Sequence, residues 1–532
     1  MAEPAAPAPP DSAPRRAGPP ELAPLTGAAK VVGTFALALA TFMNVLDTSI
    51  ANVSLSSIGG DLGAASTQVT WVITSFAVAN AIAVPLTGWL TMRFGAVRLF
   101  TASIVLFTIA SWLCGLSTSL QMLIGFRVLQ GAVAGPMIPL SQALLLSSFS
   151  RAKAGTALAI WAMTTLVAPV MGPLLGGWIT DNISWPWIFY INIPVGAFAA
   201  IATWSIYAER ETPRKILPID RIGLGLLVVW VGSLQILLDK GEELDWFHSG
   251  TIVSLGATSL VAFTVFLVWE LVGNRFPIVD LRLFKGRNFW TGTLAMSLGY
   301  GVFFGNVVVL PLWLIQYMGY TATDAGLLTA PVGILALLLS PFVGRRVGKT
   351  DPRRLATVAF LIFALSLYMR TKYNTQADFA FLVVPIVVQG AAMAFFFVPL
   401  VSLILSNLPP ERIPSASGLS NFARITAGSF GTSIATTLWD NRAILHHARL
   451  TESVSAGSLP TEVYLGVLRG GGLSMPQAAA AINRSIDVQA HLLAANDVFQ
   501  GSALLFLMLT GVIWLARRPK SAPPAGAGAE AH

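Results

Sequence analysis

Charge is scarce in this sequence of 532 residues, and cysteine is almost missing. Only 11% of the residues are charged, whereas a soluble globular chain carries about 25%. The single cysteine, Cys114, excludes an intramolecular disulfide and suggests no redox or metal role. The chain also lacks a glycine-rich phosphate loop, so ATP is not the evident energy source. No grouping of His, Asp and Glu has metal or catalytic spacing, and we therefore expect no enzyme, no cofactor and no metal.

Hydrophobic residues make up 55% of the chain and gather in long runs without charge. Most runs reach the roughly 20 residues that a membrane-spanning helix needs, and they do not alternate polar and apolar residues as barrel strands would. The sequence therefore predicts an all-α integral membrane protein with fourteen spanning helices. We place them at residues 31–53, 66–90, 97–116, 120–144, 154–178, 185–206, 220–239, 249–271, 289–316, 324–343, 354–371, 379–405, 414–439 and 496–516.

Lysine and arginine fall mainly into alternate loops between these helices. With the N-terminus inside, 24 of the 33 lie on the cytoplasmic side. Short positively charged loops are retained there, so we expect both termini in the cytoplasm. The first 29 residues lack a secretory cleavage site and are expected to be a disordered tail. The net charge of +8 is spread over loops beside lipid headgroups and does not indicate nucleic-acid binding.

Two pairs of similar segments indicate an internal repeat. VPLTGWLTMRFGAVRL (84–99) matches LSPFVGRRVGKTDPRRL (339–355), since each has a proline, a glycine three residues later and then a basic turn. RVLQGAVAGPMIPL in the fourth helix matches IVVQGAAMAFFFVPL in the twelfth. Parallel six-helix halves hold a substrate between them and rock about it. The alternative is that glycine and proline are simply common in membrane helices.

The repeat divides the chain into two six-helix halves and two extra helices. We expect the extra pair to flank the halves without lining the pathway. The expected parts are a tail at 1–29, an N-terminal half at 30–207, the extra helices with their loops at 208–287, a C-terminal half at 288–517 that contains a periplasmic loop at 440–495, and a cytoplasmic tail at 518–532.

Asp47 lies inside the first predicted helix, in TFMNVLDTSIANV. An ionised carboxylate at a helix centre costs roughly 2.5–3.5 kcal/mol on insertion scales, so it normally faces a protein interior or an aqueous cavity. Asn44 and Ser54 share its helix face, which predicts a polar stripe lining a cavity. A carboxylate whose burial and partner change can bind and release a proton, and Asp47 is the best such residue in the chain. The alternative is a structural salt bridge.

Arg127 in the fourth helix is the expected partner of Asp47. A guanidinium does not shed its proton in practice, so Arg127 would act through its charge. The alternative is a structural arginine bonded to backbone carbonyls. Polar residues that could line a substrate cavity are Asn44, Gln130, Asn306, Asn421 and Arg424, of which Arg424 would add a second charge in the C-terminal half. For the amides, interhelical hydrogen bonds are the alternative role.

The fifth helix contains APVMGPLLGG (168–177), in which glycines recur at helical spacing. Gly172, Gly176 and Gly177 form a small-residue ridge that allows another helix to approach closely. Pro169 and Pro173 weaken the backbone hydrogen bonding of the same helix. Such a surface suits a helix that slides or bends between two states, although a tight static contact explains it as well.

Together these motifs resemble the major facilitator superfamily. LDTSIANVSL (46–55) resembles the helix-one signature of its fourteen-helix drug:proton antiporter branch, and RVLQGAVAGP (127–136) resembles its helix-four motif. APVMGPLLGG resembles the antiporter motif of helix five. LPPERIPSASGLSNFARITAGSFGTS and other long stretches are similar to the EmrB-type permeases of Gram-negative tripartite pumps, and the resemblance spans about residues 30–517.

The loop after the second helix carries a further resemblance and one departure. GWLTMRFGAVR (88–98) resembles the superfamily's loop 2–3 motif, but Met92 stands where an acidic residue is usual. A charge relay through this position is therefore excluded. What is left is a turn and helix-end contact set of Gly88, Arg93, Gly95 and Arg98.

The resemblance implies proton-driven export of hydrophobic toxic compounds across the bacterial inner membrane. It implies a periplasmic adaptor protein and an outer-membrane channel as partners. It also implies that Asp47 and Arg127 serve proton coupling and that the Gly172–Gly177 ridge serves the conformational change. The alternative within this fold is a proton-coupled symporter, or a siderophore or metabolite transporter.

Overall fold

The computed structural model describes residues 23–150, 153–215, 218–273, 277–347, 349–454 and 458–518, and their regular structure is helical. Most of the two predicted tails, residues 1–22 and 519–532, lies outside these ranges. The N-terminal half comprises α1 (Gly27–Val53), α2 (Leu55–Asp61), α3 (Ser66–Val69), α4 (Trp71–Ala83), the 3₁₀ turn η1 (Val84–Leu86), α5 (Thr87–Phe94), α6 (Ala96–Gly115), α7 (Leu120–Ala134), α8 (Met137–Ser148), α9 (Ala154–Asn182), α10 (Trp187–Tyr190) and α11 (Asn192–Tyr207).

The extra pair and the C-terminal half follow. They comprise α12 (Arg221–Lys240), α13 (Gly250–Val268), α14 (Arg287–Tyr317), α15 (Ala322–Thr329), α16 (Pro331–Val347), α17 (Pro352–Arg370), α18 (Phe379–Ile404), α19 (Ile413–Ser453), α20 (Leu459–Gly470) and α21 (Met475–Ile513). Every predicted helix therefore has a counterpart, although several are divided by turns.

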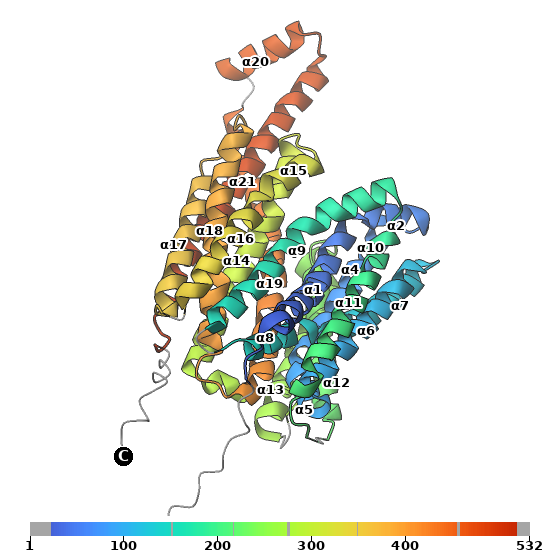
Figure 1. Ribbon diagram of the computed structural model, residues 1–532. Coiled ribbons are helices and arrows are strands. Elements are labelled where there is room, and N and C mark those ends of the chain that lie inside the picture. The colour runs from blue at the N-terminus through green and yellow to red at the C-terminus, as the bar shows by residue number, and fades with distance from the viewer. Residues whose placement is uncertain are drawn as a thin grey trace, which may run out of the picture.

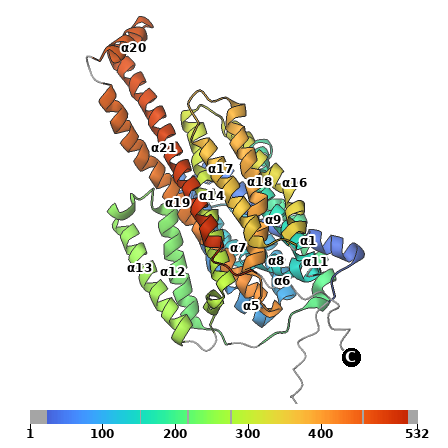
Figure 2. The ribbon, with the colours of Figure 1, turned by 90° about the vertical axis from the view of Figure 1, so that its left-hand side faces the viewer.

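Two groups of helices stand side by side, one from each half (Figure 1). Both ends of the described chain lie at one end of this bundle, called here the termini end, and α20 projects at the other, the α20 end (Figure 1). Figure 2 shows α12 and α13 as a hairpin beside α19. α12 contacts α4 of one half and α19 of the other, so the extra pair packs against both halves.

The number of spans falls just short of the prediction. In the described residues twelve helices are long and apolar enough to cross a membrane, and α9, which is bent, raises the number to thirteen. The remaining predicted segment, 414–439, forms the first part of α19 but is not among these spans. An all-α membrane fold is therefore confirmed, whereas the count of fourteen is not confirmed by length and composition.

The segment predicted as a periplasmic loop, 440–495, is largely helical. α19 continues without interruption to Ser453, and α21 begins at Met475, about twenty residues before the predicted start of the last span. α20 joins them at the tip. A hydrogen bond between the His446 Nε2 and the Asp497 Oδ2 over 2.9 Å ties α19 to α21. The extension is therefore a helical hairpin continuous with two helices of the C-terminal half.

Aspartate side chains fix where several helices begin. Asp220 accepts hydrogen bonds from the backbone N–H groups of Ile222 and Gly223 at the start of α12. Asp351 and Asp378 cap α17 and α18 in the same way. Such caps contribute about 1 kcal/mol each, which explains several of the acidic residues in the loops as structural.

The halves touch directly at the termini end. A Cβ atom on Gly155 of α9 would overlap the carbonyl oxygen of Gly344 of α16, and one on Gly88 of α5 would overlap Ser415 of α19. A Cβ on Gly418 would lie 3.0 Å from the Val84 carbonyl oxygen. Glycine is needed at these points because the two backbones approach closely. The structure thus represents a conformation that is closed at the termini end.

Candidate functional site

Asp47 of α1 and Arg127 of α7 form an ion pair inside the N-terminal half. The Arg127 Nη1 donates a hydrogen bond to the Asp47 Oδ2 over 2.5 Å, and both side chains are fully buried. Removing one partner of such a pair is strongly destabilising, because a buried charge is then left uncompensated. Two charges that lie 80 positions apart in the sequence therefore act as one buried unit.

Neutral polar side chains complete the surroundings of the Asp47 carboxylate. Gln130 Nε2 and Asn192 Nδ2 donate to its Oδ1 over 3.0 and 3.2 Å. Asn192 also donates to the Ser111 hydroxyl over 2.9 Å. The carboxylate thus connects α1 to α7 and α11, and through Asn192 to α6.

The Arg127 guanidinium is held on its other side by α4. Its Nε donates to the carbonyl oxygen of Val72 over 3.0 Å, and it lies 4.2 Å from the centre of the Phe76 ring. A desolvated cation–π contact contributes about 2 kcal/mol. Within the described residues, Nη2 has no hydrogen-bond partner. The pair is therefore fixed on three sides, and one buried donor is left unsatisfied by the protein.

The position of this cluster corrects one expectation. We expected Asp47, Asn44 and Gln130 to face a cavity, but helices of a single half enclose all three side chains. Asn44 Nδ2 donates to the carbonyl oxygen of Ala134 in α7 over 3.2 Å. The polar stripe of α1 therefore meets polar groups of neighbouring helices rather than open space.

The glycine ridge of α9 packs against the helix that carries Asp47. A Cβ on Gly172 would overlap the side chain of Ser49, and one on Gly176 would lie 2.8 Å from the Ile50 Cγ1. A Cβ on Gly177 would have more room, at 3.9 Å from Val53. Two of the three predicted ridge glycines therefore make the close contact with α1.

The prolines of α9 create a bend that α1 also supports. The two parts of the helix, Ala154–Pro169 and Leu174–Asn182, meet at 42°. Pro173 has no N–H group for the carbonyl of Pro169 one turn earlier, and the Ser49 hydroxyl donates to that carbonyl instead over 3.0 Å. The side chain of Pro173 itself lies outside the described part. The bend of α9 is thus coupled to the residue two positions after Asp47.

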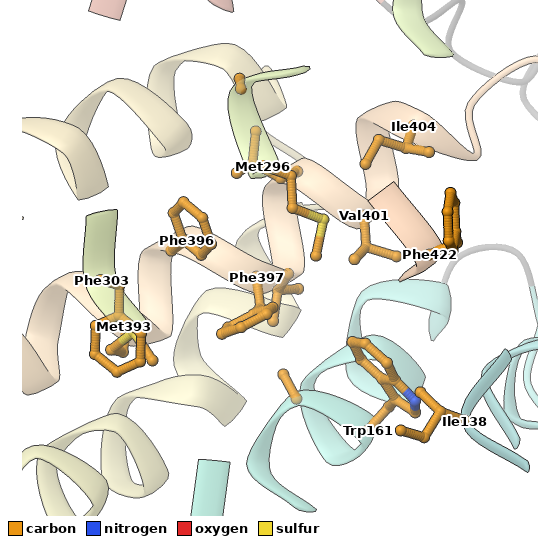
Figure 3. Close-up of a cluster of buried hydrophobic side chains, with 14 of the residues drawn as sticks. Ile138, Trp161, Met296, Phe303, Met393, Phe396, Phe397, Val401, Ile404 and Phe422 are labelled. Atoms are coloured by element: carbon orange, nitrogen blue, oxygen red, sulfur yellow. The ribbon is translucent and has the colours of Figure 1, made fainter. Parts of the chain in front are cut away.

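Aromatic side chains fill the seam between the halves (Figure 3). Trp161 of α9 and Ile138 of α8 face Phe397 and Val401 of α18. The rings of Trp161 and Phe397 meet edge to face with their centres 6.5 Å apart. Trp161, Phe397 and Val401 are all buried, so the seam is a closely packed apolar contact between the halves.

Arg424 of α19 is the charged residue next to this seam. Its guanidinium lies 4.5 Å from the centre of the Tyr300 ring and 5.8 Å from that of Phe397. It donates to the Asn421 Oδ1 over 3.0 Å, and its Nε has no partner in the described ranges. No carboxylate of the described residues lies within 4 Å of it, although the residue is only 4% exposed. Asn306, by contrast, is enclosed between α14 and α21, where it donates to Ser502.

Comparison with known proteins agrees with this architecture. The model of the Major Facilitator Superfamily matches residues 37–432. The chain belongs to the major facilitator superfamily. It is 51% identical over 507 residues to the Multidrug export protein EmrB of Escherichia coli (strain K12), covering 95% of this chain and 99% of that protein. It is 49% identical over 496 residues to the Fatty acid resistance protein FarB of Neisseria gonorrhoeae, covering 93% and 98%.

A solved structure supports the fold. The proton:xylose symporter XylE, bound to 6-bromo-6-deoxy-D-glucose, matches with a TM-score of 0.59 at 13% identity, over 92% of this chain and 95% of that one. The resemblance drawn from the motifs is therefore confirmed: this superfamily member is an EmrB-type permease in sequence and has the major facilitator fold.

In this transporter the loop after α5 is held by a residue that the motif did not include. The Glu211 carboxylate accepts hydrogen bonds from the backbone N–H groups of Val97 and Arg98 over 3.0 and 2.9 Å, at the start of α6. A Cβ on Gly95, whose φ is +90°, would overlap this carboxylate. The Arg98 side chain lies 4.0 Å from it, while Arg93 lies over Trp89. The loop thus leads into the N-terminus of α6, whose first N–H groups are capped by the Glu211 carboxylate.

Replacing Glu211 with alanine should destabilise the N-terminal half by about 1–2 kcal/mol, because two N–H groups and a helix dipole lose their acceptor. Glu211→Gln keeps an acceptor and should cost less. The measurement is the thermal unfolding midpoint of the purified protein. Equal midpoints for Glu211→Ala and the unchanged protein would contradict the capping role.

Sequence reasoning missed three members of the clusters described above: Ser111, Asn192 and Glu211. Ser111 and Asn192 are neutral and lie in long apolar helices, where single polar residues are common. A signal does exist, since a buried amide in a membrane helix must find a partner and Asp47 offers acceptor sites. Glu211 lies in a charged loop, where nothing in the sequence separates a cap from a solvated charge.

Proposed function

We propose that this chain exports hydrophobic drugs in exchange for protons, and that Asp47 and Arg127 couple the two movements. The observation that carries the proposal is the fully buried ion pair next to the bent helix α9. The names of the relatives, a multidrug export protein and a fatty acid resistance protein, support export as the direction.

A proton on Asp47 would cancel the charge that holds Arg127. The guanidinium would then be left buried without a counter-charge, which is a high-energy arrangement. Protonation therefore favours any conformation in which the pair separates, and deprotonation favours the conformation described here. Ser49, two residues from Asp47, donates a hydrogen bond to the bend of α9. A movement of α1 at the ion pair would therefore be passed to α9, which lines the seam between the halves.

The charge distribution supports an orientation. The termini end carries most of the basic loops, and such loops are retained in the cytoplasm. We place the termini end in the cytoplasm, the α20 end in the periplasm and the protein in the bacterial inner membrane. The closed contacts at Gly155 and Gly88 then lie on the cytoplasmic side.

Reconstituted protein tests the exchange itself. Vesicles with a pH gradient and an internal pH-sensitive dye should lose the gradient faster when ethidium or a lipophilic weak acid is added, because drug and proton cross in opposite directions. Empty vesicles are the control. A drug flux that leaves the gradient unchanged would rule out proton antiport, and proton and drug moving in the same direction would indicate a symporter.

Arg424 points to a preference among lipophilic compounds, and its substitution is a test. Among the described residues no carboxylate pairs with its buried guanidinium, so an acidic group on a drug would supply the missing counter-charge. Arg424→Gln should weaken binding of the anionic probe 8-anilinonaphthalene sulfonate by about tenfold or more, since a charged hydrogen bond contributes about 1.5–3 kcal/mol. Binding of the neutral probe N-phenyl-1-naphthylamine should change little. Equal losses for both probes would argue against charge recognition.

We further propose that the hairpin tip receives a periplasmic adaptor, through which the permease would reach an outer-membrane channel. No residue of α20 is buried. Its Leu459, Val463 and Val467 are 74%, 58% and 65% exposed and recur every four residues, so they form one apolar face. An amphipathic helix with an open apolar face suits a helical partner.

Changing these three residues to serine should abolish copurification of a tagged adaptor protein expressed together with the permease. Membrane levels of the permease should change little, because the three side chains are largely exposed and have little packing to lose. Thr461→Ala, on the opposite side of α20, is the matched control. Full adaptor recovery with the triple variant would place the contact elsewhere.

A further inference from the structure

The helix α12 is wedged between the two halves near the α20 end. On the side of the N-terminal half, Lys240 Nζ donates to the Thr70 hydroxyl over 2.7 Å and lies 5.7 Å from the centre of the Trp71 ring. Two turns earlier, a Cβ on Gly232 would lie 3.9 Å from the Val78 Cγ1 of α4. One side of α12 therefore packs along α4 and against Thr70, the residue that precedes α4.

The opposite edge of α12 follows α19 of the C-terminal half. Gln235 Nε2 donates to the Ser429 hydroxyl over 3.0 Å, and the Ser433 hydroxyl donates to the Leu238 carbonyl oxygen over 2.8 Å. Near the middle of the helix, the ring of Trp230 meets that of Phe422 edge to face with centres 5.6 Å apart. These contacts extend over more than two turns of both helices.

The two edges differ in extent. α12 packs more extensively against α4 than against α19, and its polar contact to the N-terminal half is made by a charged ammonium group, whereas the hydrogen bonds to α19 join neutral groups. The segment that leads into α12 is also fastened to the N-terminal half. Glu211 caps α6, and the Lys215 N–H donates to the Met92 carbonyl over 2.8 Å.

We propose that α12 moves as a seventh helix of the N-terminal half, and that its hydrogen bonds to α19 are a latch released in each transport cycle. Rocking of the halves changes the distance between α4 and α19, so α12 has to part from one of them. The less extensive contacts with α19, which include the neutral hydrogen bonds at Ser429 and Ser433, are the ones that give way. Because they exist in the conformation closed at the termini end, they stabilise that conformation.

This proposal depends on the proposed export only for its transport readout, and cross-linking tests it directly. The native Cys114 is buried, so introduced cysteines are the reactive ones. In reconstituted protein, linking Gln235→Cys to Ser429→Cys with a short bis-thiol reagent should stop drug transport, with more than about a tenfold loss. Linking Val78→Cys to Gly232→Cys should leave most of the transport. If the second link stops transport, or the first does not, the proposal is wrong.

Distances between spin labels give a readout that needs no drug or proton movement. Labels at the α20 ends of the two halves should report a shift of the conformational equilibrium of roughly fivefold for Ser429→Ala, the ratio expected from one neutral hydrogen bond. Ser259→Ala is the matched control, because its hydroxyl donates to Trp230 within the hairpin. An unchanged equilibrium in Ser429→Ala, or an equal shift in both variants, would overturn the latch whether or not the protein is a proton antiporter.

Discussion

Asp47→Asn is expected to abolish uphill drug export while leaving the protein in the membrane. Each proton that crosses with a potential of 100 mV and a pH difference of one unit supplies about 3.7 kcal/mol, enough for a drug gradient of roughly 500-fold. Without a titrating group at residue 47 the variant would only equilibrate the drug, so the accumulation ratio should fall to about one. Drug accumulation in inverted vesicles energised by a pH gradient measures this directly.

The same substitution has a structural cost that must be separated from the loss of coupling. Asparagine leaves the buried Arg127 without a counter-charge, which should lower the free energy of unfolding by about 3–5 kcal/mol. The double variant Asp47→Asn/Arg127→Gln removes both charges and should recover most of the thermal stability without recovering uphill transport. Full uphill transport by either variant would remove Asp47 from the coupling mechanism.

Gly155→Val is expected to open the contact between the halves at the termini end. A side chain there overlaps the backbone of Gly344, which cannot turn aside as a flexible side chain can. Overpacking of this kind costs about 1–3 kcal/mol, a shift of roughly 5- to 150-fold in the conformational equilibrium. Each half keeps its own packing, so the variant should fold, bind drug and transport at least about tenfold more slowly.

Spin-label distances across the termini end should lengthen in Gly155→Val. Gly125→Val is the matched control, since a Cβ on Gly125 of α7 meets nothing within 4 Å. A normal transport rate in Gly155→Val would mean that the closed contact is not part of the cycle, and slow transport in both variants would point to a general loss of helix stability.

The sequence predicts the spans well because an apolar run of about 20 residues, folded as a helix, matches the thickness of the bilayer's hydrocarbon core. It predicts the meeting of Asp47 and Arg127 for a related reason, since two buried charges of opposite sign stabilise one another. It does not predict what surrounds them. Helical periodicity identifies the polar face of α1, but whether that face meets a cavity or polar groups of other helices depends on the packing of α7 and α11.

The structure differs from the sequence-based prediction at two further places, and in both the cause is again the packing of other helices. α19 carries Arg424 and many small polar residues, so composition alone understates its place in the bundle, where α14 packs tightly against it. The extension at 440–495 has too few apolar residues to resemble a span, yet α19 and α21 support each other as helices through contacts such as that of His446 with Asp497. In both places the structure depends on contacts between helices that are far apart in the sequence, which local composition does not reveal.

The uninterrupted course of α19 makes it a mechanical lever. Its 41 residues reach about 60 Å, of which a membrane takes about 30 Å, and from Ser415 to Ser453 it contains no proline that would act as a hinge. A tilt of about 10° inside the membrane therefore displaces the outer end by roughly 5 Å over the remaining length. A protein bound to α20 would therefore be displaced, with each such tilt of the C-terminal half, by a distance about as large as one helical turn.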